Sequence, residues 1–354
     1  MLSKILQNKY AKYLDSIGIT LNGDGRRDLR VHDSRLYRRV FFKGTLGFGE
    51  AYMDDWWDVD ALDEFIAAVL LDIETRDTSV VGTHLPSLLR TLLTNLQKPS
   101  RAFHIGKKHY DTGNDLFIAM LDSHMNYSCG YWKDAHNLED AQQAKMKLVC
   151  EKLMLEPGMK VLDIGCGWGG TAKYMAENYD VTVTGITVSD EQAGHARAWG
   201  KGLPIDIKLM DYRDLRGKFD RIYSIGMFEH VGYKNYRTYM RAVRNLMHEN
   251  SLFLLHTIGS SRTVRMTDPW IEKYIFPNSM LPSAAQITAA CNGLLMVEDW
   301  HNFGAYYDKT LMAWLENFEA HWPRLKDRYD ERFYRMWKYY LAACAGAFRA
   351  RSNR

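Results

Sequence analysis

A glycine-rich turn is the feature of this chain whose residue types and spacing point most directly to chemistry. Residues 161–170 read VLDIGCGWGG, so an apolar run meets Asp163 and three glycines follow at every second position. Glycine lets the backbone approach a ligand closely because it has no Cβ, and open α/β sheets bind ligands at the carboxyl ends of their strands. The spacing differs from the dinucleotide fingerprint and from the phosphate loop. Asp163 would repel a pyrophosphate but suits amine, sulfonium or hydroxyl groups, which favours S-adenosylmethionine over a purely structural bend.

Polar residues after the next two expected strands complete the predicted cofactor site. Many methyltransferases carry an acid after the second strand, but this chain has Thr187 there and Gln192 one helical turn further on. An ordinary loop residue and a solvated helix residue are the alternative. After the third strand, Asp211 could accept from the adenine amine while Tyr212 stacks on the ring; helix capping is the competing role for Asp211. The cofactor residues predicted from these segments are Asp163, Gly165, Cys166, Gly167, Trp168, Gly169, Thr187, Gln192, Asp211 and Tyr212.

Alternating strands and helices must position these residues. Strands are expected at 160–164, 181–186, 205–210, 221–225 and 252–256, with helices at 171–179, 190–199 and 236–247. Such alternation with short connections predicts a mainly parallel sheet with helices on both faces. The predicted fold class is therefore α/β, a Rossmann-like class I methyltransferase fold with a small, mainly helical N-terminal domain. The aromatic, proline-punctuated stretch 268–278 is expected to pass over the site.

Residues 1–98 are predicted to form the N-terminal domain, and 99–354 the catalytic domain. Within the first, residues 60–71 place leucine, phenylalanine, isoleucine and valine on one helical face. A second apolar helix is expected at 85–96, and the polar stretch 97–100 is typical of a linker. Burial in a core is the simpler role for both helices. A membrane-contacting face is the alternative, because leucine stripes beside basic residues also fit an interfacial helix.

Composition excludes several classes of protein. The 354 residues carry a net charge of +3 and no basic run that would indicate nucleic-acid binding, although a local cluster spans 101–109. Five scattered cysteines without CxxC spacing predict a reducing compartment, no disulfide framework and no zinc site. The N-terminal apolar run is too short for a signal peptide. We expect a cytoplasmic protein that meets lipid, if at all, at the inner face of the membrane.

Read in order, seven motifs resemble the cyclopropane-fatty-acyl-phospholipid synthases, which are S-adenosylmethionine-dependent enzymes. The resemblance covers nearly the whole chain, and it lies in residues 44–53, 109–117, 127–132, 226–232, 256–259, 299–304 and 344–349, besides the glycine turn. It implies methylene transfer from S-adenosylmethionine to the cis double bond of an acyl chain in a membrane phospholipid. It also implies a homodimer, and it matches Tyr127 and Ser128 to residues near the cofactor.

The resemblance further implies a bound bicarbonate, the base that removes a proton during ring closure. The residues implied to hold it are Cys129, Glu229, His256, Ile258 and Tyr307. His256 and Tyr307 can donate to an oxyanion, and backbone N–H groups at Cys129 and Ile258 add neutral donors. Glu229 would orient His256 or accept the bicarbonate hydroxyl proton. The family is also assigned a functional cysteine at the position of Cys344, for which burial as a small apolar group is the alternative.

Aromatic side chains suit the positive charge that alkene attack leaves on an acyl chain, through cation–π attraction. Eight fall in the motifs or the 268–278 stretch, and only some are expected to line a tunnel: Tyr110, Tyr127, Tyr131, Trp132, Phe228, Trp270, Tyr274 and Tyr307.

Three other functions remain open. A related lipid C-methyltransferase would stop before ring closure, and a catalytically silent lipid-binding protein could keep the scaffold. A small-molecule N- or O-methyltransferase has less need of these aromatic residues.

Overall fold

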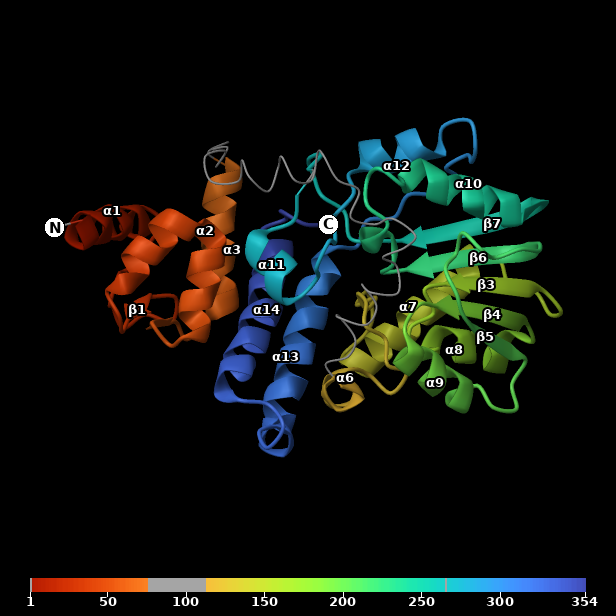
Figure 1. Ribbon diagram of the computed structural model, residues 1–354, viewed down its shortest axis with the longest axis horizontal. Helices are drawn as coiled ribbons and strands as arrows, with labels where there is room; N and C mark the ends of the chain where they lie inside the picture. The colour runs from red at the N-terminus through yellow and green to blue at the C-terminus, as the bar shows by residue number, and fades with distance from the viewer. Residues whose placement is uncertain (1, 76–112, 265) are drawn as a thin grey trace.

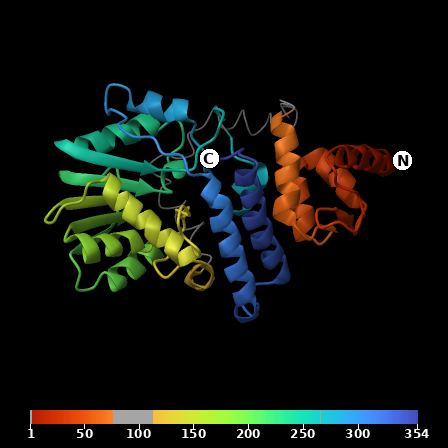
Figure 2. The same cartoon turned by 180° about the vertical axis from the view of Figure 1, so that it is seen from behind.

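A computed structural model describes residues 2–75, 113–264 and 266–354. Three parts lie side by side in both views: N-terminal helices, a pair of long C-terminal helices in the middle, and a sheet with its own helices (Figures 1 and 2). The expected helix at 85–96, the linker, the basic cluster, Tyr110 and the boundary near residue 98 lie outside the described residues.

Five parallel strands form the sheet, in the order β5-β4-β3-β6-β7. They are β3 (Lys160–Ile164), β4 (Thr182–Thr187), β5 (Ile205–Leu209), β6 (Phe219–Ile225) and β7 (Met247–His256). The sequence predicted all five, although β6 and β7 begin two and five residues earlier than expected. From β3 the chain continues to β4 and β5 on one side of the sheet, and from β6 it continues to β7 on the other side. The neighbours β3 and β6 are therefore the point where the strand order reverses, and such sheets bind ligands at the carboxyl ends of these strands.

Successive residues of β3 point to opposite faces of the sheet, and each face is covered by helices. Val161 packs with α7 (Leu138–Lys152) and α8 (Gly170–Tyr179). Leu162 packs with α10 (Tyr236–Leu246) and α12 (Ala284–Cys291). The remaining sheet helix, α9 (Asp190–Trp199), packs alanines against Ile207 of β5. This alternation places Asp163 on the same side as α7 and α8.

The N-terminal part contains α1 (Leu2–Ser16), α2 (Arg35–Met53), α3 (Leu62–Thr75) and a two-stranded sheet of β1 (Arg30–Val31) and β2 (Trp57–Asp58). Gly44 interrupts α2 with φ 54° and ψ −135°, a conformation open to glycine. The helix predicted at 60–71 corresponds to α3, which begins two residues later and extends to Thr75, and its Leu62 and Phe65 are buried. Ile66 and Val69 are partly buried and pack against the same core, whereas Leu70 is not part of it, so the core role predicted for that apolar face is confirmed for four of its five residues.

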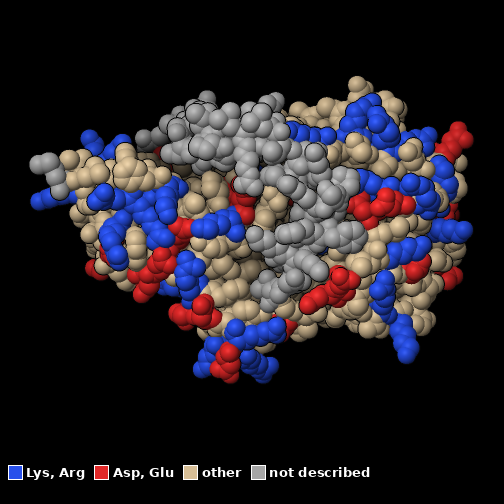
Figure 3. Space-filling view, in the orientation of Figure 1, with Lys and Arg blue, Asp and Glu red and all other residues tan. Residues whose placement is uncertain are grey.

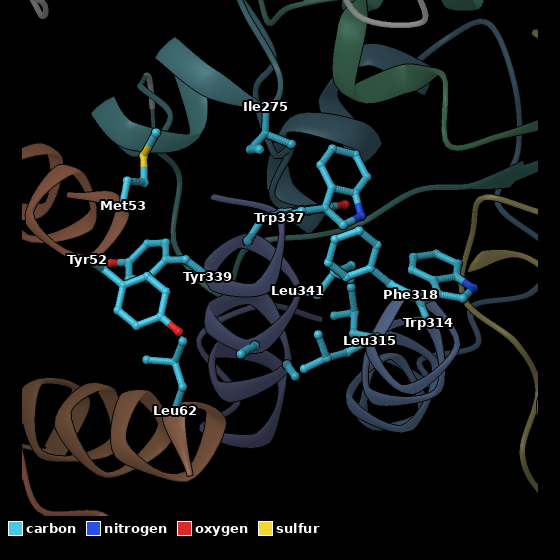
Figure 4. Close-up of a cluster of buried hydrophobic side chains, with 14 of the residues drawn as sticks. Tyr52, Met53, Leu62, Ile275, Trp314, Leu315, Phe318, Trp337, Tyr339 and Leu341 are labelled. Carbon is cyan, nitrogen blue, oxygen red and sulfur yellow. The ribbon is translucent and has the colours of Figure 1, made fainter. Parts of the chain in front are cut away.

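Two long helices, α13 (Ala305–Leu325) and α14 (Glu331–Arg349), pack against α6 (Asn114–Met120) and α3. One continuous core unites the N-terminal helices with this pair. Figure 4 shows Tyr52 and Leu62 facing Tyr339 of α14, while Trp314 and Phe318 come from α13. Residues 2–75 therefore share their core with the C-terminal helices.

The 268–278 stretch contains α11 (Pro269–Tyr274), whose Asp268 caps the helix. Trp270 is buried against Tyr339, with ring centroids 4.6 Å apart, so this side chain belongs to the shared core. Phe276 reaches further, to within 6.5 Å of the Tyr127 ring and 6.1 Å of the His230 ring. The segment thus joins the N-terminal part to the edge of the sheet.

Candidate active site

A pocket opens at the carboxyl ends of β3, β4 and β6. It brings together residues that lie far apart in the sequence. Of the twelve predicted cofactor residues, eleven line it: Tyr127, Ser128, Asp163, Gly165, Cys166, Gly167, Trp168, Thr187, Gln192, Asp211 and Tyr212. The twelfth, Gly169, lies just behind the wall, at the N-cap of α8.

The glycine turn has the backbone geometry that its sequence predicts. Gly165, Gly167 and Gly169 have φ of 93°, 53° and 88°, values that side chains with a Cβ rarely adopt. A Cβ at Gly167 would meet no protein atom within 4 Å, so this position faces open space in the pocket. A Cβ at Gly170 would lie 1.8 Å from the carbonyl oxygen of His124. The turn therefore presents main-chain atoms without side chains, so a ligand can approach the backbone closely.

Asp163 lies at the base of this pocket and is 3% exposed. The hydroxyl of Tyr223 donates to its Oδ2 at 2.7 Å. Burial raises the pKa of Asp163 to about 7, although the Tyr223 bond and the charge of Lys145 oppose that shift. A cationic group of a ligand placed here would compensate the buried carboxylate.

Thr187 and Gln192 are both buried and bonded to each other, since the Thr187 hydroxyl donates to Gln192 Oε1 at 3.0 Å. Gln192 is therefore an inward-facing residue, and the solvated alternative is excluded. Asp211 accepts two bonds from the guanidinium of Arg213, at 2.7 and 2.6 Å, and begins a turn that leads to no helix. The capping role is therefore not observed. Tyr212 packs edge-on against Tyr239 and still lines the pocket.

None of the six predicted catalytic residues lines this pocket, but two directly follow or precede residues that do, and a third bonds to one. Cys129 follows Ser128, and Glu229 lies between Phe228 and the pocket residue His230. His256 ends β7, where its carbonyl accepts from the backbone N–H of Gly226 at 3.0 Å. Cys129, Glu229 and His256 therefore adjoin residues of the pocket.

Glu229 and His256 each hold a buried polar atom with no hydrogen-bond partner among the described residues: Glu229 Oε2 and His256 Nδ1. Burial raises the pKa of Glu229 and lowers that of His256 to about 3. The imidazole is thus neutral, with one donor and one acceptor nitrogen. Glu229 Oε1 accepts the N–H of Ile258 at 2.7 Å. That N–H was expected to face an oxyanion, so the expectation for Ile258 is wrong here: its N–H instead fixes the carboxylate.

The other predicted catalytic residues lie in apolar surroundings. The Tyr307 ring contacts Trp314 and Phe348, with centroids 5.9 and 4.6 Å away, and burial raises the pKa of its hydroxyl. Burial also raises the pKa of the Cys129 and Cys344 thiols to about 12. Neither thiol is activated as a nucleophile, which favours the apolar role for Cys344. The Cys129 thiol donates to the carbonyl of Gly130 at 3.3 Å.

Sequence reasoning missed a buried polar cluster beneath the pocket. Lys145 of α7 is 1% exposed, and its Nζ donates to Asn126 Oδ1 and to Ser128 Oγ, both at 2.9 Å. Asn126 and Thr171 line the pocket as well. Lys145 lies in an ordinary amphipathic helix, where a lysine is usually solvated. Only its position on the apolar face, with Ala141, Met146 and Val149, signalled burial.

The fold and the pocket define a class I S-adenosylmethionine-dependent methyltransferase, and comparisons with known proteins agree. Residues 97–354 match the family model described as mycolic acid cyclopropane synthetase. The chain is 56% identical over 342 residues to a cyclopropane-fatty-acyl-phospholipid synthase of Escherichia coli, covering 96% of this chain and 88% of that protein. It is 34% identical to cyclopropane mycolic acid synthase 2 of Mycobacterium bovis, covering 72% of this chain and 92% of that protein.

Solved structures give the same result. The cyclopropane synthase MmaA2 of Mycobacterium tuberculosis has a TM-score of 0.67 at 29% identity, covering 71% of this chain and 95% of that one. CmaA1 in complex with SAH and CTAB has a TM-score of 0.66 at 32% identity, with the same coverage. This chain therefore belongs to the mycolic acid cyclopropane synthetase family and is an enzyme, which confirms the resemblance found in its sequence.

Proposed function

We propose that this enzyme transfers a methylene group from S-adenosylmethionine to the cis double bond of an unsaturated acyl chain in a membrane phospholipid, and so forms a cyclopropane ring. The observation that carries the proposal is that a cofactor pocket lies next to buried polar residues that could hold a base. A polar, glycine-lined pocket fits the cofactor, and beside its wall lie Glu229 and His256, each with a buried polar atom that has no partner among the described residues. Tyr307 lies in the aromatic core that also packs around Tyr127. The name of the 56% identical relative supports the same substrate and product.

When bound, S-adenosylmethionine supplies an electrophilic methyl carbon at its sulfonium. The chain's own residues would hold it by the backbone of the glycine turn and by Asp163, with Thr187, Gln192, Asp211 and Tyr212 toward the nucleoside end. Aromatic rings from several elements surround Tyr127: Phe117, Phe276 and Trp314 lie 5.1–6.5 Å from it. Such rings would exclude water and stabilise positive charge on an acyl chain. Phe228 instead stacks on Tyr236 within the sheet core.

Ring closure requires a base, and we assign this role to a bicarbonate held by Glu229 and His256, with Tyr307 as the third polar group. Buried polar atoms without partners cost free energy unless they bind something. Glu229 Oε2 and His256 Nδ1 are two such atoms. The raised pKa of Glu229 favours a carboxyl group that keeps or accepts a proton. Ile258 holds Glu229 through Oε1, which leaves Oε2 without a partner among the described residues, and we assign this oxygen to the anion rather than to His256.

Access to phospholipid requires contact with a membrane, which we assign to the N-terminal domain. No helix within the described ranges is both long and apolar enough to span a bilayer. Helices α1 and α2 carry seven Lys or Arg residues against two acids, and blue side chains gather over them in Figure 3. Phe41 and Phe42, on α2, are 49% and 64% exposed. Exposed aromatic residues among basic ones fit an anionic lipid surface.

One assay tests the activity. The enzyme is incubated with unsaturated phospholipid vesicles and labelled S-adenosylmethionine, and the lipid product is identified by its mass. Cyclopropanation adds 14 mass units (one CH₂) and removes the double bond's reactivity toward ozone. A product that gains the same mass but keeps an alkene would indicate methylation without ring closure. No labelled lipid would leave the silent lipid-binding alternative. The homodimer expected from the family is tested by light scattering.

A further inference from the structure

We propose that Lys145 is a positioning residue for the cofactor: through Ser128, its buried ammonium presents a polarised hydroxyl to the carboxylate of S-adenosylmethionine. The inference rests on the proposed cofactor but assigns a role to a residue that does not touch the pocket.

The direction of each hydrogen bond follows from the chemistry of lysine. An ammonium has three N–H donors and no acceptor. Lys145 Nζ therefore donates to Ser128 Oγ and to Asn126 Oδ1, at 2.9 Å each. Because Ser128 Oγ accepts from the ammonium, its own O–H remains able to donate to another group. Among the described residues, Ser128 Oγ has no partner besides Lys145, and Ser128 lines the pocket. The hydroxyl proton is thus available to a ligand.

The second partner of Lys145 has no such spare group. Asn126 Oδ1 also accepts from the Thr171 hydroxyl at 3.3 Å, and Asn126 Nδ2 donates to Asp122 Oδ2 at 2.9 Å. Asp122 in turn accepts the backbone N–H groups of His124 and Asn126. Asn126 therefore uses its side chain to hold Lys145 in place, and it links the ammonium to a buried counter-charge. Ser128 is the one partner through which Lys145 can act on a ligand.

The charges beneath the pocket match a zwitterion. Lys145 is the buried cation, and Asp163, on β3, is a buried acid that lines the pocket itself. Burial lowers the pKa of Lys145 to about 8, and the charges of Asp122 and Asp163 oppose that shift. The amino-acid end of S-adenosylmethionine carries an ammonium and a carboxylate. The ammonium of S-adenosylmethionine complements the Asp163 carboxylate. The carboxylate of S-adenosylmethionine then accepts from the Ser128 hydroxyl, which is itself bonded to the Lys145 ammonium.

Two ligands separate this role from a merely structural one. S-adenosylmethionine and its decarboxylated form differ only in the carboxylate, and calorimetry measures their affinities for the full-length enzyme. Lys145→Met should weaken binding of S-adenosylmethionine about 10- to 100-fold, as expected for a lost charge-assisted hydrogen bond. Binding of the decarboxylated form should stay within about 3-fold of wild type. Lys147→Met, on the exposed face of the same helix, is the matched control and should change neither affinity.

Loss of a buried charge could unfold the protein, so Ser128→Ala provides a second arm. It removes the hydroxyl and leaves Lys145 bonded to Asn126. It should show the same selective loss for S-adenosylmethionine, and Lys145→Met added to Ser128→Ala should cost little more. Equal weakening of both ligands by Ser128→Ala, or unchanged affinity for S-adenosylmethionine, overturns the role of Lys145 while the proposed function stands. A wild-type enzyme that binds neither ligand overturns the proposed function itself.

Discussion

At the scale of the residue, two neighbouring sites follow different chemical rules. The cofactor pocket depends on backbone that carries no side chains and on buried charges, whereas Glu229 and His256 beside it each keep a buried polar atom without a partner among the described residues. Each can be tested by a substitution that changes one of them and leaves the other intact.

Gly167→Val tests the role of the glycine turn in cofactor binding. A valine there must adopt φ near +53°, and its side chain would enter the open space of the pocket. Calorimetry should find no binding of S-adenosylmethionine. Gly202→Val is the control, because Gly202 has φ +89°, is exposed and would also meet no atom. The control shares the backbone strain, which costs on the order of 1–3 kcal/mol, but should keep full affinity. Normal affinity in Gly167→Val would refute the cofactor assignment.

Glu229→Gln tests the base. The amide keeps the shape of the side chain but alters its protonation, so turnover should fall by about 10²- to 10⁴-fold while affinity for S-adenosylmethionine persists. Bicarbonate should stimulate the wild type in carbonate-depleted buffer, and stimulate the variant less. Glu298→Gln, at an exposed acid, should behave as wild type. Full wild-type activity without carbonate, or normal turnover of Glu229→Gln, would contradict the bound-base mechanism.

At the scale of the element, the contacts between α2, α3, α11 and α14 decide how the N-terminal part is attached. Two of these contacts depend on single residues. Gly346 of α14 allows a close approach to α3, and Glu50 of α2 binds α11.

Gly346→Ala should destabilise the enzyme. The new Cβ would lie 2.7 Å from the carbonyl oxygen of Asp63 and 3.0 Å from the backbone nitrogen of Ala67. Backbone cannot yield as a flexible side chain does, so we expect a loss of about 1–3 kcal/mol in unfolding free energy, measured with urea. Gly194→Ala is the matched control, since Gly194 lies in α9 with no atom within 4 Å. It should be neutral or stabilising by up to about 1 kcal/mol.

Glu50 should contribute stability in a pH-dependent way. Its Oε1 accepts from Lys273 at 2.5 Å and from Tyr274 at 3.0 Å, and its Oε2 accepts from Arg39 at 3.0 Å. Burial alone would raise the pKa of Glu50, but these bonds outweigh it and lower the pKa from 4.5 to about 2. A depressed folded-state pKa adds stability above about pH 4.5, which is lost as pH falls toward 2.

Glu50→Gln should therefore lower the unfolding free energy at pH 7, and its effect should shrink steadily below pH 4.5. Parallel urea titrations of wild type and variant from pH 7 to pH 3.5 measure the difference. A difference that is independent of pH over this range would show that the Glu50 carboxylate is not the stabilising group.

At the scale of the whole molecule, charge is distributed unevenly along the N-terminal part. Helices α1 and α2 are basic, whereas residues 54–75 carry eight acids and no Lys or Arg. Most of these acids are ion-paired with arginines. We therefore expect the basic helices α1 and α2, rather than residues 54–75, to face an anionic bilayer.

Phe41→Ser combined with Phe42→Ser tests this face. Binding to anionic phospholipid vesicles should weaken by about 10-fold or more, because part of the apolar area that enters the bilayer is lost. Binding by the wild type should also fall as salt rises. Met296→Ser with Val297→Ser is the control, since both residues are exposed but belong to the sheet part. Equal loss in both double variants, or none in the first, would place the docking surface elsewhere.

Local sequence determined much of this protein. The glycine turn, the five strands and the helices between them could be predicted, because positive φ values and alternating apolar residues depend on near neighbours along the chain. So could nine residues of the pocket, since the ends of parallel strands meet at one edge of the sheet, while Tyr127 and Ser128 came from the family resemblance. Family resemblance named the residues behind that pocket but could not foresee that Glu229 binds the Ile258 N–H.

Only the tertiary structure decided the rest. Glu50 and Lys273 are 223 positions apart, and α3 meets α14 from the opposite end of the chain. Lys145 becomes a buried cation beneath the pocket because α7 packs on the Asp163 face of the sheet, where Asn126 and Ser128 can accept its N–H groups. Contacts of this kind depend on how all the elements pack together. The place of Lys145 on the apolar face of its helix indicates burial, but the sequence does not show which groups accept its N–H bonds.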